Sequence, residues 1–125
     1  MMALQVARTA LRETCEELGI PCANIELYGD ALTPLYIPTS RFRATPFVAF
    51  TPARPPIRAN TNEVEEIIEP TLTMLLDEKN IFEESVDFRG YPAIVPYFAI
   101  NGHKVWGATA MILSEFREML RSAMQ

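Results

Sequence analysis

The chain has 125 residues, 49% of them hydrophobic and 22% charged, and it carries a net charge of −5 at pH 7. These proportions are typical of a globular protein, and the length predicts a single domain, residues 1–125, with a modest core. The negative charge argues against general binding to nucleic acids or anionic membranes, and no apolar run reaches the roughly 18 residues of a membrane-spanning helix.

The first predicted element is a helix over residues 3–18, because apolar residues recur there at helical spacing. The apolar stripe consists of Leu4, Ala7, Leu11, Cys15 and Leu18. Gly19 is placed to end the helix in the left-handed conformation. Cys15 and Cys22 lie on either side of the helix end. Two cysteines alone predict no disulfide framework, and they favour a reducing cytoplasm as the location.

The middle of the chain is predicted to contain short strands and loops. Strands are expected over residues 25–28, 35–37 and 46–50, and the last is expected to be buried because it is a continuous apolar run. The prolines of residues 51–62 predict a loop with little regular structure. A further strand is expected over residues 64–69.

The last part of the chain has clearer local signals. A short helix is expected to end at Asp77, with Thr71 or Thr73 as its N-cap. The Asn101-Gly102 pair favours a type I′ hairpin turn between two strands. The remaining predicted elements are strands over residues 81–88, 94–100 and 103–106 and an amphipathic helix from Thr109 onward.

Three acids are concentrated near the end of the first helix. Glu13, Glu16 and Glu17 have i, i+3, i+4 spacing, so their carboxylates project from one face of a helix. Like charges placed in this way repel each other. The face is therefore either fully solvated, which is the commoner arrangement, or occupied by a hard cation such as Mg²⁺ or Mn²⁺, which oxygen ligands favour.

The order of residues around these acids is more informative than their spacing. The segment Arg12-Glu13-Thr14-Cys15-Glu16-Glu17-Leu18-Gly19-Ile20 resembles the C-terminal half of the Nudix box. This box is the signature of hydrolases that cut nucleoside diphosphates linked to another moiety. Residues 62–76 and 105–110 resemble later Nudix segments, and the second of these is most similar to the branch of coenzyme A diphosphatases.

The resemblance implies an α/β fold, a Nudix-like α/β/α sandwich with a mixed sheet. The Nudix box has a glutamate at the position of Leu4, and its glycine-rich turn would lie ahead of Met1. We therefore expect a Nudix-like domain without its N-terminal strands and without the first half of the box. Because missing strands would uncover sheet edges, we also expect the chain to associate into a homo-oligomer.

The resemblance also assigns roles to single residues. It makes Glu13, Glu16 and Glu17 the ligands of Mg²⁺ or Mn²⁺, and Glu17 can instead bind a metal-bound water. Arg12 would orient a carboxylate; the alternative is a simple i, i+4 pair with Glu16. Glu63 is expected to add a further catalytic acid, with Glu65 as the next candidate, unless these acids only solvate a strand edge.

Two functions remain open from the sequence. The first is a metal-dependent pyrophosphohydrolase in which water attacks one phosphorus of a nucleotide diphosphate such as coenzyme A. The intact Glu13, Glu16 and Glu17 favour it. The second is a catalytically silent Nudix-like domain that binds a nucleotide or a protein partner, which Leu4 favours.

Overall fold

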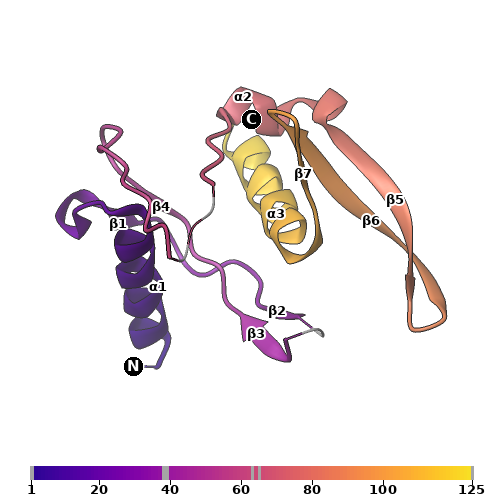
Figure 1. Cartoon of the computed structure of the whole chain (residues 1–125), viewed down its shortest axis with the longest axis horizontal. Coiled ribbons are helices and arrows are strands. Elements are labelled where there is room, and N and C mark those ends of the chain that lie inside the picture. The colour runs from indigo at the N-terminus through magenta and orange to yellow at the C-terminus, as the bar shows by residue number, and fades with distance from the viewer. Residues whose placement is uncertain (1, 38–39, 63, 65, 125) are drawn as a thin grey trace. The chain divides into compact units, whose positions relative to one another are not determined.

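The computed structural model describes residues 2–37, 40–62, 64 and 66–124. The chain forms two compact units, Met1–Ile67 and Ile68–Gln125 (Figure 1). Both units contain helices and small antiparallel sheets, which confirms the predicted α/β class and is consistent with a Nudix-like fold. The described ladders are all antiparallel, so the parallel pair of a mixed sheet is not among them.

The first unit begins with helix α1, Met2–Leu18, where the sequence predicted it. Ala7 and Cys15 of the predicted stripe are buried. Gly19 has a φ of 63°, and the N–H of Ile20 donates to the carbonyl of Cys15 at 3.0 Å. This is the Schellman arrangement, in which a left-handed residue closes the helix end. The predicted cap is confirmed.

Two small ladders follow α1 in the first unit. Strand β1 (Glu26–Leu27) pairs with β4 (Ala49–Phe50), and β2 (Leu35–Ile37) pairs with β3 (Phe42–Ala44). Both residues of β4 are exposed, so the expected burial of this strand is wrong. Burial depends on what packs over a strand, and its own apolar sequence cannot supply that cover.

The strand expected over residues 64–69 is also wrong for the described residues in that range. The N–H of Val64 donates to the carbonyl of Asn60 at 2.8 Å. The side chain of Asn60 also accepts from the N–H of Asn62 at 3.1 Å. These local turn contacts use a backbone donor that a strand would need for its ladder. Glu63 and Glu65 lie outside the described residues.

The second unit starts with helix α2, Leu72–Leu76, and a short 3₁₀ turn, Glu78–Asn80. Thr71 is the N-cap of α2, and its side chain accepts from the N–H of Met74 at 3.1 Å. Of the two threonines that the sequence offered as caps, the structure therefore selects Thr71. Asp77 caps the 3₁₀ turn in the same way, through the N–H of Lys79 at 3.0 Å.

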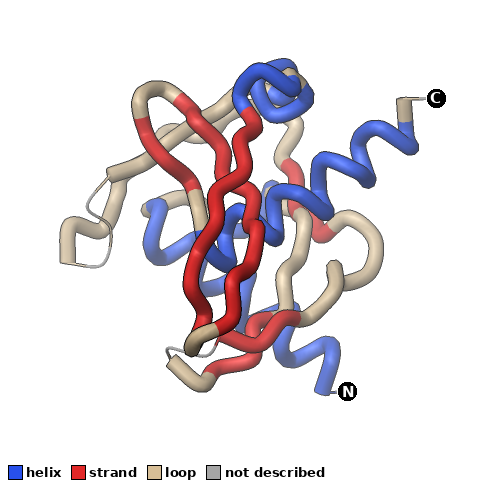
Figure 2. Tube along the Cα trace, turned by 90° about the vertical axis from the view of Figure 1, so that its right-hand side faces the viewer, coloured by secondary structure: helices blue, strands red, loops and turns tan. Residues whose placement is uncertain are grey.

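A three-stranded antiparallel sheet, in the order β5-β6-β7, follows in the second unit. Its strands are β5 (Ile81–Phe88), β6 (Tyr91–Ile100) and β7 (His103–Val105), drawn in red in Figure 2. The turn residues Asn101 and Gly102 have φ of 51° and 80°. Positive values at both positions define the predicted type I′ turn, which is confirmed.

Strand β6 contains two prolines, which remove backbone donors. Pro92 pairs with Asp87 and Pro96 with Glu83 across the β5 ladder. The β5–β6 turn has two residues, so the pair beside it is hydrogen-bonded and the pairs alternate from there. Both prolines then occupy non-hydrogen-bonded pairs, with their nitrogens directed away from β5. β7 pairs with β6 only over residues 98–100, so neither proline interrupts a ladder.

Helix α3, Gly107–Ala123, completes the second unit and shares its core. The buried core residues are Leu75 of α2 and Phe98 and Ile100 of β6. The side chains packed around them are Met74, Ile81, Val105, Leu113 and Phe116. The core therefore joins α2, the sheet and α3.

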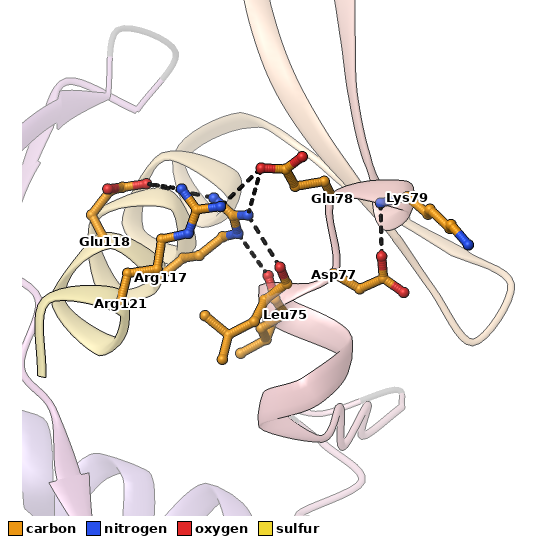
Figure 3. A network of polar contacts seen from close by, with 8 residues as sticks. Leu75, Asp77, Glu78, Lys79, Arg117, Glu118 and Arg121 are labelled. Carbon is orange, nitrogen blue, oxygen red and sulfur yellow. Dashed lines mark hydrogen bonds and ion pairs between the residues drawn. The ribbon is translucent and has the colours of Figure 1, made fainter. Parts of the chain in front are cut away.

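Arg117 of α3 is buried, with 8% of its surface exposed. Its Nε donates to the carbonyl of Leu75 at 3.0 Å, and its Nη2 donates to the carbonyl of Leu76 at 3.1 Å (Figure 3). Carbonyls at a helix end lack partners within the helix, so Arg117 caps α2 from outside. Glu118 and Glu78 lie 3.5 and 3.9 Å from the guanidinium and balance its charge.

Candidate active site on the first helix

The three candidate metal ligands lie on the solvent side of α1. The side chains of Glu13 and Glu16 are 58% and 60% exposed, and Glu17 is half-buried. Cys15, between them in sequence, is only 7% exposed. The helix therefore turns its apolar stripe inward and leaves the carboxylates available to a ligand from solvent.

Arg12 lies within this acidic group. Its Nη1 donates to Oε1 of Glu16 at 3.1 Å, and its Nη2 lies 4.0 Å from Oε1 of Glu13. The first contact is the i, i+4 pair that the sequence offered as one alternative. An exposed pair of this kind contributes only about 0.3–0.5 kcal/mol, so a stronger ligand can displace it. The role of Arg12 in orienting a carboxylate stays a prediction.

The fit to a metal ion rests on the chemistry of the donors. Carboxylate oxygens are the ligands that Mg²⁺ and Mn²⁺ prefer. Among the residues that the structure describes, however, no three histidine, cysteine, aspartate or glutamate side chains form a group that could hold a metal ion. Glu13, Glu16 and Glu17 are thus the right kind of donor on one helical segment, and their action as ligands stays a prediction.

The end of the acidic helix is held by a distant segment of the first unit. The N–H of Asn60 donates to the carbonyl of Glu17, and the N–H of Arg58 donates to the carbonyl of Leu18, both at 2.8 Å. A Cβ at Gly19 would lie 2.3 Å from the carbonyl oxygen of Arg58. Residues 58–60 therefore fix the last turn of α1. The sequence predicted only a loop there, because no local pattern reports such a contact.

An apolar pocket of about 240 Å³ lies in the first unit, next to the helix exit. Residues 51–56 form one part of its wall, and Pro21, Asn24 and Ile25 form the other. The proline-rich loop thus borders a pocket with its first half and contacts α1 with its second half. Ligand pockets are typically about 300–1,000 Å³, so this pocket is too small to enclose a drug-sized ligand by itself.

Cys15 and Cys22 are joined by a disulfide, which corrects the expectation that the two cysteines form none. Their Cα atoms are 5.8 Å apart. Gly19 turns the chain back at the helix end, and the following 3₁₀ turn, Cys22–Asn24, brings Cys22 over Cys15. Sequence spacing could not show this proximity, because it depends on the backbone path after the helix.

The first unit thus has an acidic helix with an arginine among its glutamates. A glycine cap and a proline-rich loop fix the end of this helix. The chain therefore belongs to the class of α/β proteins whose candidate site is built from carboxylates. No protein-family model matches the chain. Several curated proteins, however, are similar to the chain in sequence. The chain is 34% identical over 112 residues to the mitochondrial coenzyme A diphosphatase NUDT8 of Mus musculus. The match covers 86% of the chain and 51% of that protein.

Several bacterial relatives carry the name Nudix hydrolase NudL. The chain is 29% identical over 116 residues to that of Photorhabdus laumondii, covering 93% of the chain and 61% of the relative. It is 36% identical over 106 residues to that of Salmonella paratyphi B, covering 85% of the chain and 54% of the relative. The chain is thus related to the Nudix hydrolase family, and it spans about half the length of the curated relatives that it matches.

These relatives confirm the resemblance to Nudix hydrolases that residues 12–20 indicated. By their names, the relatives are enzymes. They also confirm the similarity to coenzyme A diphosphatases, since one relative carries that name. In the part of the chain that the structure describes, no helix is both long and apolar enough to cross a membrane.

Proposed function

We propose that the chain acts as a metal-dependent pyrophosphohydrolase on a nucleoside diphosphate linked to another moiety, with coenzyme A as the first candidate substrate. The observation that carries this proposal is the Nudix order of residues 12–20 on one described helix, with Glu13 and Glu16 exposed to solvent. The name of the Mus musculus relative supports coenzyme A. We further propose a cytoplasmic location, where a disulfide such as that between Cys15 and Cys22 is usually transient.

In the proposed reaction, water attacks one phosphorus of the diphosphate and the bridging P–O bond breaks. Two products leave, each with one of the two phosphoryl groups of the diphosphate. Glu13, Glu16 and Glu17 would hold Mg²⁺ or Mn²⁺, which supplies positive charge to the diphosphate oxygens. Glu16 would exchange its contact with Arg12 for the cation. The carbonyls of Glu17 and Leu18 are fixed by residues 58–60, so the last turn of α1 is held in position for this task. Glu63 stays the candidate for a further acid.

The first prediction concerns the metal. Millimolar Mn²⁺ should raise the melting temperature of the chain, because a ligand that binds only the folded state stabilises that state by mass action. At a ligand concentration of a hundred times the dissociation constant, the free energy of unfolding rises by about 2.7 kcal/mol. Glu16→Gln should abolish the rise. Glu26→Gln, which removes the same charge from an exposed strand of the same unit, should retain it. If Mn²⁺ produces no shift in the wild type, the glutamates form a solvated face only.

The second prediction concerns turnover. With Mn²⁺, the chain should cleave coenzyme A into two products, each retaining one of the two phosphoryl groups of the diphosphate, which mass spectrometry detects. Glu17→Gln should lower the rate about 10–100-fold, as loss of a group in a metal site typically does. Leu4→Glu restores the carboxylate of the Nudix pattern and should raise the rate. Binding of Mn²⁺ without cleavage of any nucleotide diphosphate would favour the silent Nudix-like domain instead.

A further inference from the structure

The disulfide lies inside the candidate site. It closes a loop over residues 15–22, and this loop contains Glu16, Glu17 and Gly19. Cys15 is buried on the inner side of α1, whereas Cys22 is half-buried in the turn that follows. The bond therefore ties the last helical turn, with two of the three candidate ligands, to the chain segment that leaves it. Cys22 is the sulfur that a reagent in solution can reach.

The fold also has a place for the reduced form. Sγ of Cys22 lies 3.6 Å from the carbonyl oxygen of Leu11, a distance at which a thiol S–H can donate. The Schellman bond of Ile20 and the bonds from Arg58 and Asn60 are made by backbone atoms. None of these contacts requires the disulfide. These contacts would remain available after reduction of the bond, and a reversible pair requires a unit that stays folded in both redox states.

We propose that Cys15 and Cys22 are a reversible thiol–disulfide pair that controls the order of residues 16–19. The oxidised form holds the helix end closed, and the reduced form leaves it to backbone contacts alone. This proposal goes beyond the proposed hydrolase function, because it concerns the redox chemistry of the chain itself and applies whether or not a diphosphate is cleaved.

The oxidant in the proposed step is a low-molecular-weight disulfide such as oxidised glutathione. The Cys22 thiolate attacks one of its sulfurs, and a sulfur–sulfur bond forms as the first glutathione thiolate leaves. The Cys15 thiolate then attacks Sγ of Cys22, which forms the intramolecular disulfide and releases the second glutathione thiolate. The two protein thiols lose two electrons and two protons in total, and one glutathione disulfide becomes two thiols.

The test compares the whole wild-type chain with itself in two redox states, without denaturant. After equilibration with mixtures of reduced and oxidised glutathione, alkylation and mass spectrometry count the free thiols. The count should pass reversibly between two and zero. Hydrogen exchange at the amides of Leu18, Gly19 and Ile20 should be at least threefold faster in the reduced form. The oxidised form should melt about 5–10 °C higher, because the bond restricts the unfolded chain.

Cys22→Ser is the matched control, since its hydroxyl keeps a donor near the carbonyl of Leu11 but cannot form the bond. Its exchange rates and melting temperature should be the same in both glutathione buffers and close to those of the reduced wild type. Three outcomes for the wild type would overturn the proposal: free thiols that persist in oxidised glutathione, a disulfide that survives excess reduced glutathione in the folded state, or equal exchange rates in both states. None of them requires the variant to fold.

Discussion

Gly19→Ala should lower the free energy of unfolding of the first unit by about 2–5 kcal/mol, because it combines two costs. The backbone φ of 63° is one that a side chain adopts at a cost of about 1–2 kcal/mol. The added Cβ would also lie 2.3 Å from the carbonyl oxygen and 2.9 Å from the Cβ of Arg58. Residues 58–60 would have to move away from the helix end. Chemical denaturation followed by circular dichroism measures the loss.

Gly29→Ala separates the two costs. Gly29 has a similar φ of 68°, but nothing lies within 4 Å of the position of its Cβ. It should therefore lose only the backbone part, about 1–2 kcal/mol. The difference between the two variants measures the close approach of Arg58 to Gly19. Equal losses in the two variants would mean that the loop does not pack against the helix end as the structure shows.

Arg117→Met should lower the free energy of unfolding by about 2–4 kcal/mol, because the carbonyls of Leu75 and Leu76 would lose their partner at a partly buried helix end. Methionine fills much of the same volume, so the effect reports the lost donors more than a cavity. Arg117→Lys should recover only part of the loss, since one ammonium cannot reproduce the planar fork that reaches both carbonyls. The measurement is the midpoint of urea unfolding.

Arg121 is the control for charge. Its Nη2 contacts Oε1 of Glu78 at 2.8 Å and its Nη1 lies 3.7 Å from Glu118, but its side chain is 42% exposed. Arg121→Met should therefore cost less than about 1 kcal/mol. If Arg121→Met were as damaging as Arg117→Met, the acidic side chains and not the α2 carbonyls would be the important partners in this network (Figure 3).

The features that the sequence predicted correctly are those decided by neighbouring residues. The left-handed cap at Gly19, the type I′ turn at Asn101 and Gly102, and the threonine cap of α2 each depend on a few adjacent positions. The expectation of a strand over residues 64–69 is wrong because another local signal, the turn at Asn60, competes with the β pattern there.

Contacts between distant residues could not be predicted from one sequence. Arg117 has its partners 41 and 42 positions away, so nothing in the helical pattern of α3 indicates that an arginine is buried there. The same holds for Arg58 at Gly19. In the candidate site, residue order predicted the acidic helix and Arg12, whereas the disulfide depends on the path of the chain after the helix.

The two prolines of β6 limit what can attach to the β5–β6 hairpin. Over residues 91–97 one edge of β6 is not paired with β7, and an extended chain that approached it would find no N–H at Pro92 or Pro96. Ile94 and Tyr91, which are 72% and 76% exposed, would otherwise make this edge a template for fibril growth. β6 has no charged residue, so its prolines take the part in preventing aggregation that charged side chains take on other edge strands.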